Sequence, residues 1–305
     1  MPYVRSRDGH SLFVRVVGRG EPCLLVHGFA SDSRSWLPFV APFTRRHSFV
    51  IPDLRGFGRS HEAPLGRTCP LTQFAEDLED TLAALAIPSL PVIGISMGAF
   101  TTVQSFRLFG GERFSRYLHI DQGPVIHNRA DYAFGMLGAA QARFFTRLRS
   151  LLADLDAHLH LPWAELPRAL QREFWALLAD FAAAAFSTRP LAAVVGALTR
   201  QERFMRSMLK VERWQSYINI VRAYLELDYD LRDGFRAIDV PLTVLIGGSS
   251  RMYPPAGQRT IATLAPHAVI REIPRAGHMI PYEAPRAFLR ELDLFLADTA
   301  TSGLP

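Results

Sequence analysis

The chain contains only two cysteines among its 305 residues, Cys23 and Cys69. The first lies in an apolar run typical of a core strand, and the second lies in a predicted loop. Two cysteines placed in this way resemble neither a disulfide framework nor a cluster of metal ligands. We therefore expect a fold that needs no disulfide, and a protein that works in the reducing cytoplasm.

Long apolar runs are also missing. Residues 1–9 lack the apolar central stretch of a signal peptide. The longest weakly polar stretch, Phe181 to Leu198, is interrupted by Arg189 and Pro190, so it falls short of the roughly 20 uninterrupted apolar residues that a membrane helix needs. This stretch predicts two buried helices, and neither export nor a membrane partner is expected.

Charges of one sign do not gather anywhere along the chain. The 34 Lys and Arg residues outnumber the 29 Asp and Glu residues by only 5, and the basic residues are scattered. Binding to nucleic acid needs a clustered basic face with interleaved aromatic residues, so no nucleic-acid partner is predicted, and an anionic substrate has little support. The sequence also lacks a G-x-G-x-x-G motif, a P-loop and a metal-spaced His/Cys set, so neither a cofactor nor a metal is predicted.

Short apolar runs alternate with helix-like segments from the amino terminus to about residue 123, which is typical of a mostly parallel sheet covered by helices. The first two strands flank the turn dipeptide Asp8-Gly9 and are expected to form a hairpin. A helix is expected to start with Thr72 as its cap and to end before Pro88. The strands expected in this half are 3–7, 12–17, 23–26, 49–52, 90–95 and 117–120, and a second helix is expected at 97–109.

The spacing of the apolar residues changes after this region. From about residue 128 to 236 there are almost no strand-like runs, and apolar residues recur at helical spacing. Strand character returns at 242–246 and 269–273, and a final amphipathic helix is expected from 285 to 297. The middle segment is therefore predicted to be a helical insert in an α/β protein.

Gly94-Ile95-Ser96-Met97-Gly98 matches the G-x-S-x-G motif and lies between a predicted strand and a predicted helix, as that motif requires. The glycines let the two backbones approach closely, so that the serine sits on a sharp turn with its hydroxyl exposed. The alternative is a small-residue turn that only packs well. We predict that Ser96 is a nucleophile.

His27-Gly28-Phe29-Ala30 follows an early strand. Backbone amides from such a loop and from the residue after the nucleophile can stabilise an oxyanion, so Phe29 and Met97 are the predicted donors. His27 itself is expected to order the loop by hydrogen bonding. Near the carboxyl end, His278 follows the last predicted strand and is the predicted general base, although a surface or capping role is the commoner fate of a histidine.

The segments His27-Gly28-Phe29, Asp53-Leu-Arg-Gly-Phe-Gly-Arg-Ser60, Gly94-Ile-Ser-Met-Gly98 and Gly277-His-Met-Ile-Pro-Tyr-Glu-Ala-Pro285 together resemble the α/β-hydrolase superfamily in type, order and spacing. The resemblance implies an eight-stranded, mostly parallel sheet with an antiparallel second strand, with helices on both faces, and a helical cap between strands six and seven. It thus implies a core formed by 1–123 and 237–305 and a cap formed by 124–236. It also implies that Asp53 and Arg55 are structural.

The sequence departs from this family at the acid of the triad. The usual acid follows strand seven in a pattern like Gly-x-x-Asp, but here Ser250 occupies that position. Asp121 directly follows strand six, where haloalkane dehalogenase relatives place their acid, and it is the predicted acid; the alternative is an ordinary turn former at a strand end. Those relatives and the epoxide hydrolases of this fold use an aspartate nucleophile, so a serine at position 96 argues against their chemistry.

These residues predict a serine hydrolase that cleaves a carboxylic ester, lactone or thioester through an acyl-enzyme on Ser96. The partner is a small molecule, and the oligomeric state stays open. Acyl transfer, carbon–carbon hydrolysis and a non-catalytic receptor on the same fold are the alternatives. The cap should supply a largely apolar pocket, although most of its aromatic residues are expected to be core: Phe144, Phe145, Trp163, Phe174, Trp175, Phe181, Phe186 and Trp214.

Overall fold

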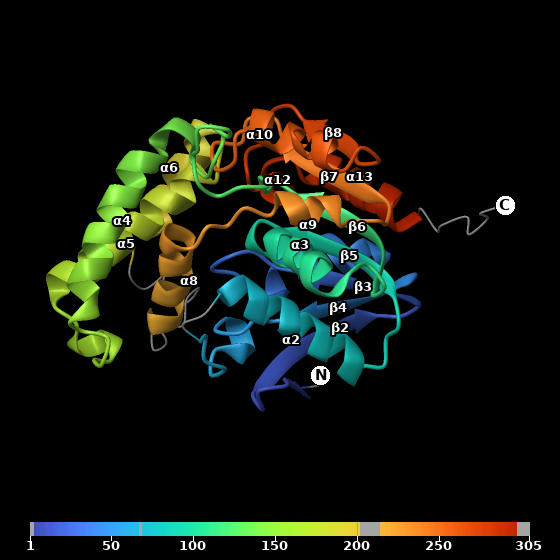
Figure 1. Ribbon diagram of the computed structural model, residues 1–305, viewed down its shortest axis with the longest axis horizontal. Helices are drawn as coiled ribbons and strands as arrows, with labels where there is room; N and C mark the ends of the chain where they lie inside the picture. Colours follow the sequence, from blue (N-terminus) through green and yellow to red (C-terminus); the bar gives the residue numbers. More distant parts are fainter. Residues whose placement is uncertain (1–2, 67–68, 200, 202–213, 298–305) are drawn as a thin grey trace.

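An eight-stranded sheet forms the centre of the protein (Figure 1). The computed structural model describes residues 3–66, 69–199, 201 and 214–297. The strands follow the order β1-β2-β4-β3-β5-β6-β7-β8 across the sheet. Their bounds are β1 Tyr3–Arg5, β2 Ser11–Gly18, β3 Glu21–Val26, β4 His47–Pro52, β5 Leu90–Ile95, β6 Phe114–Ile120, β7 Leu242–Gly247 and β8 Val269–Ile273.

The direction of the strands agrees with the sequence-based prediction. Strands β1 and β2 pair antiparallel as a hairpin, with Val4 opposite Leu12. Strand β2 is also antiparallel to β4, and every other neighbouring pair is parallel. The carboxyl ends of the parallel strands therefore lie at one edge of the sheet, where loops from different strands meet.

Alternating side chains of the strands enter two hydrophobic cores, because successive residues of a strand point to opposite faces. In β3, Cys23 and Leu25 pack on one face with helix α13 (Pro285–Ala297), whereas Leu24 and Val26 pack on the other face. That second face is covered by α2 (Pro70–Ala84), α3 (Met97–Phe109) and α9 (Arg232–Arg236). Helices therefore cover both faces, as the sequence predicted.

Several strand and helix boundaries differ from the expectation by a few residues, and the start of α2 is one of them. Helix α2 begins at Pro70 rather than after Thr72, and its N-cap, Cys69, makes no side-chain capping bond. Proline suits the first position of a helix because the amide it lacks would have no partner there. The predicted bounds of β8, α3 and α13 are confirmed.

Four longer helices lie in the described part of the chain between β6 and β7, where the helical insert was predicted. Figure 1 shows them as a layer beside the sheet. Their bounds are α4 Gln141–Asp156, α5 Arg168–Ala184, α6 Arg189–Thr199 and α8 Trp214–Glu226. Residues 200 and 202–213 of the predicted insert lie outside the described residues. No helix in the described part of the chain is long and apolar enough to cross a membrane.

Candidate active site

Ser96 occupies a strained turn between β5 and α3. Its backbone has φ 54° and ψ −125°, a positive-φ conformation that is costly for a residue with a side chain. The neighbouring glycines make the turn possible: a Cβ on Gly94 would lie 2.7 Å from the Cα of Ala99, and one on Gly98 would lie 2.4 Å from the carbonyl oxygen of Val26. The turn therefore has the geometry that exposes a nucleophilic hydroxyl.

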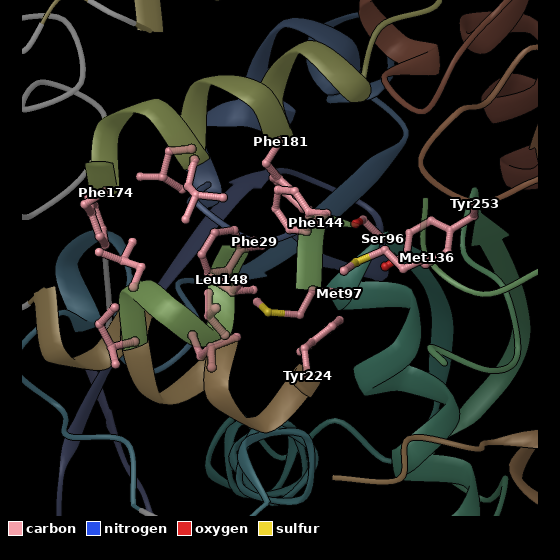
Figure 2. Close-up of a pocket in the computed structure, with 16 residues that line it drawn as sticks. Phe29, Ser96, Met97, Met136, Phe144, Leu148, Phe174, Phe181, Tyr224 and Tyr253 are labelled. Atoms are coloured by element: carbon pink, nitrogen blue, oxygen red, sulfur yellow. The ribbon is translucent and has the colours of Figure 1, made fainter. Parts of the chain in front are cut away.

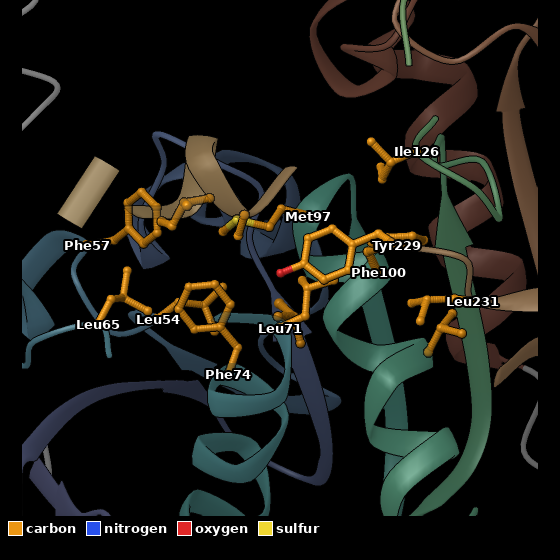
Figure 3. Close-up of a cluster of buried hydrophobic side chains, with 14 of the residues drawn as sticks. Leu54, Phe57, Leu65, Leu71, Phe74, Met97, Phe100, Ile126, Tyr229 and Leu231 are labelled. Carbon is orange, nitrogen blue, oxygen red and sulfur yellow. The ribbon is translucent and has the colours of Figure 1, made fainter. Parts of the chain in front are cut away.

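The backbone of Ser96 is fixed on both sides. Its amide donates to the carbonyl of Ile120 at 3.0 Å, and its carbonyl accepts from the amide of Phe100 at 3.0 Å. Helix α3 below it packs into the hydrophobic cluster of Figure 3, where Met97 and Phe100 lie among side chains of α2 and of the loop after β4. Among the described residues, the Ser96 hydroxyl has no hydrogen-bond partner, and it faces a cavity.

Two backbone amides beside Ser96 are free to bind a ligand oxygen. Met97 is the first residue of α3, so its amide has no partner within the helix. Phe29 follows Gly28, and a Cβ on Gly28 would lie 3.2 Å from the Cβ of Ser96. The Phe29 loop therefore runs directly alongside the serine. Within the described parts of the chain, neither the Met97 nor the Phe29 amide donates to a protein acceptor.

His27 orders this loop rather than facing the cavity. Its Nε2 accepts from the amide of Leu54 at 3.0 Å, so its Nδ1 is the protonated nitrogen and donates to the carbonyl of Gly28 at 2.8 Å. The ring is fully buried, and this burial lowers the pKa of His27. These contacts agree with the role in loop ordering that the sequence suggested.

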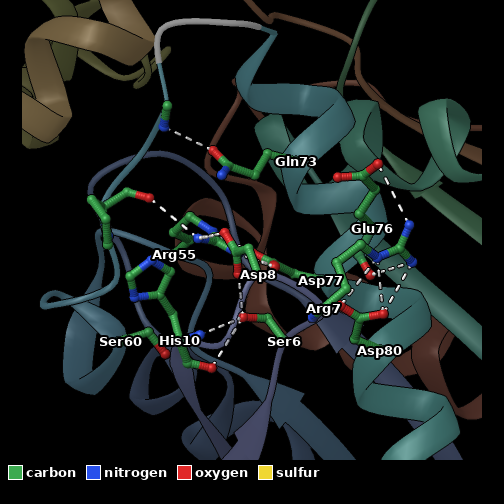
Figure 4. Close-up of polar contacts among 12 residues, drawn as sticks. Ser6, Arg7, Asp8, His10, Arg55, Ser60, Gln73, Glu76, Asp77 and Asp80 are labelled. Atoms are coloured by element: carbon green, nitrogen blue, oxygen red, sulfur yellow. Dashed lines mark hydrogen bonds and ion pairs between the residues drawn. The ribbon is translucent and has the colours of Figure 1, made fainter.

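Asp53 and Arg55 hold the turn after β4. The carboxylate of Asp53 accepts from the amides of Ser33 and Arg59, both at 2.7 Å. The buried guanidinium of Arg55 pairs with Asp8 and Asp77, both at 2.6 Å (Figure 4). All of these contacts join loops and helices of the core, and neither Asp53 nor Arg55 lines the cavity beside Ser96.

Asp121 and His278 meet at the carboxyl edge of the sheet. Asp121 follows β6 and is fully buried, and its Oδ2 lies 2.8 Å from Nδ1 of His278. His278 lies on the loop between β8 and α12 (Ile280–Glu283). Its Nε2 has no hydrogen-bond partner among the described residues. His278 lines the same cavity as Ser96, so the structure brings the three predicted residues to one place.

Three further groups hold the carboxylate of Asp121. The Gly247 amide donates to Oδ1 at 2.8 Å, the Ser250 hydroxyl donates to Oδ2 at 2.7 Å, and the Gln258 amide nitrogen donates to Oδ1 at 2.9 Å. Ser250 stands where the family usually has its acid, and here it supports the acid that follows β6. The sequence analysis missed Gln258, which belongs to no motif. It lies on α10 (Pro255–Arg259) and is fully buried.

The histidine loop is tied to the connection between α5 and α6. The Met279 amide donates to the carbonyl of Ala185 at 3.1 Å. Glu283 accepts from the Ser187 amide at 2.8 Å, from its hydroxyl at 2.9 Å and from the Thr188 amide at 3.1 Å, and its other oxygen accepts from the Gly277 amide. We call these contacts the Glu283 clamp. The clamp joins the residue before His278 to the helical insert.

The cavity beside Ser96 has two lobes, which share Phe29, Ser96, Leu178 and Phe181. The cap lobe extends under α4, α5 and α8 (Figure 2). The histidine lobe extends past His278 toward the loop after β3. The cap lobe is also lined by Met97, Met136, Phe144, Leu148, Leu151, Phe174, Leu177, Ile218, Ile220, Val221, Tyr224 and Tyr253.

The eight aromatic residues of the insert that the sequence analysis named divide between cavity and core. Four of them line a lobe: Phe144, Phe174, Phe181 and Phe186. The other four are buried in the packing of the insert: Phe145, Trp163, Trp175 and Trp214. No cluster of His, Cys, Asp or Glu that could hold a metal ion occurs in the described parts of the chain.

Comparison with known proteins identifies the family and the fold. A non-heme haloperoxidase from Rhodococcus erythropolis is 26% identical over 282 residues, which cover 91% of this chain and 93% of that protein. The fold is similar to that of an esterase from Exiguobacterium antarcticum, with a TM-score of 0.75 at 17% identity over 97% of this chain and 98% of that one. It is also similar to an enol-lactonase from Burkholderia xenovorans LB400, with a TM-score of 0.72 at 21% identity over 97% and 100%. The model of the Alpha/beta hydrolase family matches residues 23–291, and this chain therefore belongs to that family.

Proposed function

We propose that the protein is a serine hydrolase that cleaves a carboxylic ester, lactone or thioester of a largely apolar small molecule. The observation that carries the proposal is the 2.8 Å contact between Asp121 and His278 beside the strained turn of Ser96. A nucleophile, a base and a group that orients the base are the minimal set for acyl transfer. The fold is shared with an esterase and an enol-lactonase, which supports an ester-type bond as the target.

In the first half of the reaction, Nε2 of His278 takes the proton of the Ser96 hydroxyl while Oγ attacks the acyl carbon. The carbonyl π bond breaks, and its electron pair becomes an oxyanion that the Met97 and Phe29 amides stabilise. When the carbonyl re-forms, the bond to the leaving oxygen or sulfur breaks. His278 donates its proton to that atom, and an acyl-enzyme on Ser96 remains.

Water completes the cycle. His278 takes a proton from a water molecule, whose oxygen attacks the acyl carbon, and the same two amides stabilise the second oxyanion. The bond to Oγ then breaks, the proton returns from His278 to Ser96, and the carboxylic acid leaves. Throughout the cycle, Asp121 holds Nδ1–H of the imidazole and stabilises its positive charge.

Each part of the chain has its own role in this mechanism. We propose that residues 1–123 and 237–305 form the catalytic core and that residues 124–236 act as its cap, which supplies walls of the pocket. The mechanism needs no cofactor and no metal. We also propose a cytoplasmic location, which the two free cysteines favour.

The test is turnover of a short-chain nitrophenyl ester together with labelling by a fluorophosphonate. Wild-type protein should release nitrophenol and become labelled on Ser96. Ser96→Ala should fold normally, should not be labelled, and should lose roughly four to six orders of magnitude in turnover. His278→Ala should lose at least about a hundredfold. A wild-type protein that binds esters without turnover or labelling would instead be a small-molecule receptor.

A further inference from the structure

The two lobes of the cavity differ in the catalytic groups that line them. Ser96 lines both lobes, but His278 lines only the histidine lobe, and Met97 lines only the cap lobe. If Ser96 attacks an ester, the bond that breaks lies at the junction of the lobes. The part of the substrate on one side of this bond must then lie in one lobe, and the part on the other side must lie in the other lobe.

The position of His278 decides which side enters which lobe. After attack, His278 must donate its proton to the leaving atom, so that atom has to lie on the histidine side of Ser96. The acyl chain points the other way from the acyl carbon. Building on the proposed function, we infer that the cap lobe binds the acyl group of the substrate and the histidine lobe binds the alcohol or thiol that leaves.

The lining of the cap lobe defines the chemical class of the acyl group. Among the described residues that line it, the polar side chains other than that of Ser96 are the phenols of Tyr224 and Tyr253, and none is charged. Burial raises the pKa of both phenols, so they stay neutral at physiological pH. An acyl group that carried a second carboxylate would have to bury an unpaired charge there, which costs several kcal/mol. The acyl group is therefore uncharged and apolar.

The sizes of the lobes indicate which part of the substrate is larger. The cap lobe has a cavity volume of about 80 Å³, and the histidine lobe has one of about 430 Å³. One water needs about 10–15 Å³ of such space, so the cap lobe holds roughly five to eight heavy atoms. The larger lobe is also lined by three residues that carry a hydroxyl group, Ser31, Ser35 and Tyr282. The leaving group is therefore larger than the acyl group and can be more polar.

Two ester series measure these expectations separately. In the acyl series, with one constant alcohol, kcat/KM should rise about threefold to fourfold per methylene until the chain has roughly five to eight carbons, and it should then fall. An acyl group of the same length that ends in a carboxylate should react at least about a hundredfold more slowly. In the alcohol series, with a constant acyl group, larger and hydroxylated alcohols should be tolerated. Equal kcat/KM for the charged and apolar acyl groups would overturn the inference.

Matched variants test which part of the substrate each lobe binds. Val221→Phe narrows the cap lobe and should lower kcat/KM for hexanoyl esters about tenfold relative to acetyl esters, whereas Val221→Ala should move the optimum to longer acyl chains. Ala182→Phe narrows the histidine lobe and should change the alcohol series instead. An effect of Val221→Phe on the alcohol series, with the acyl series unchanged, would reverse the assignment.

Labelling separates this inference from the proposed function. If wild-type Ser96 does not react with a fluorophosphonate, the proposed hydrolase mechanism fails. If Ser96 is labelled and esters are cleaved, but the Val221 and Ala182 variants shift neither series, only the assignment of the lobes is wrong. Thermal unfolding of each variant shows whether a changed kcat/KM comes from a folded protein.

Discussion

The carboxylate of Asp121 lies 2.8 Å from His278 Nδ1, although Asp121 follows β6 and the family's usual acid follows β7. Strands β6 and β7 are parallel neighbours, with Ile120 paired to Leu245. Their carboxyl ends are therefore adjacent, and a carboxylate from either strand can reach the same imidazole. The hydroxyl of Ser250, after β7, donates to Asp121 at 2.7 Å, so the two positions are in direct contact.

Asp121→Asn is expected to cripple ester hydrolysis. An amide at this position cannot stabilise the imidazolium and can favour the wrong tautomer of His278; the equivalent change costs about ten-thousandfold in kcat in serine proteases. Steady-state kinetics on a nitrophenyl ester measure the loss. Ser250→Ala is the control and should be mild, because Asp121 keeps three of its four partners. A fall in Asp121→Asn no larger than that in Ser250→Ala would remove Asp121 from the mechanism.

Adding Ser250→Asp to Asp121→Asn tests whether the two strand ends are interchangeable. The new carboxylate would stand at the family's usual position and should restore part of the lost kcat. A misplacement of about 1 Å can cost a hundredfold, so even a partial recovery is meaningful. The single variant Ser250→Asp, which would place two carboxylates side by side, should be less active than the wild type.

Gln258→Met should lower kcat about tenfold while KM changes little. The variant removes the 2.9 Å donor to Asp121 with little change in side-chain volume, and hydrogen bonds to charged groups are worth about 1.5–3 kcal/mol. Gln104→Met is a matched control, because Gln104 is also buried and donates to one side chain, that of Thr72, and neither residue lines the cavity. It should lower the melting temperature without a change in kcat. Equal kcat values for the two variants would argue against a positioning role for Gln258.

Glu283→Gln should slow the reaction of Ser96 with a fluorophosphonate by about tenfold. One carboxylate oxygen accepts three hydrogen bonds from Ser187 and Thr188, and the other accepts from Gly277, the residue before His278. An amide group would bring a donor against at least one of these N–H groups. Ser187→Ala removes only the hydroxyl and should slow labelling about twofold. Wild-type labelling rates in Glu283→Gln would show that the clamp does not position His278.

His119 should make the fold sensitive to acid. Its Nε2 donates to the carbonyl of Gln122 at 2.8 Å, and its Nδ1 faces the Tyr117 hydroxyl at 2.8 Å. Burial lowers the pKa of His119 from 6.5 to about 4. Between these values the unfolded chain takes up a proton that the folded protein does not, so the free energy of unfolding falls as the pH falls from 6.5 to 4, by about 3 kcal/mol in all.

The measurement compares wild type with His119→Gln by urea denaturation at pH 7.5 and pH 4.5. The variant can keep one donor and one acceptor but cannot titrate, so it should lose less stability between the two pH values. The comparison is needed because His27, whose pKa is also lowered by burial, contributes a fall of the same sign in both proteins. An identical pH dependence in the two proteins would assign no part of it to His119.

Local patterns in the sequence were sufficient to predict the sheet and the turn at Ser96. Strand alternation and the small residues at 94 and 98 act over a few neighbours, so they can be recognised without a structure. The contact between Asp121 and His278 could be predicted from strand order, because it needs only the carboxyl edge of the sheet. The hydrogen bond from Gln258 to Asp121 could not be predicted, because it depends on how α10 packs against a strand end more than 100 residues away in the chain.

The residues that line the cavity also could not be predicted from the sequence. Phe174 and Trp175 are adjacent in α5, both are largely buried, and both pack against Trp163, with ring centroids 5.1 and 5.0 Å away, but only Phe174 also lines the cap lobe. Helical spacing identifies apolar positions without showing whether a cavity or another helix covers them. The Glu283 clamp likewise joins two loops about 95 residues apart in the chain.

The Glu283 clamp has a consequence for how substrate enters. The hydrogen bonds from Met279 to Ala185 and from Ser187 to Glu283 make the edge of the helical insert and the loop of His278 one mechanical unit. If the contacts of the Glu283 clamp opened, an ester could enter the cavity. The imidazole of His278 would then be unsupported while the ester bond is still intact. Closing the contacts between the insert and the His278 loop would then also position the base. In the open protein, water could enter the cavity, but Ser96 would lack a positioned base and could not yet attack.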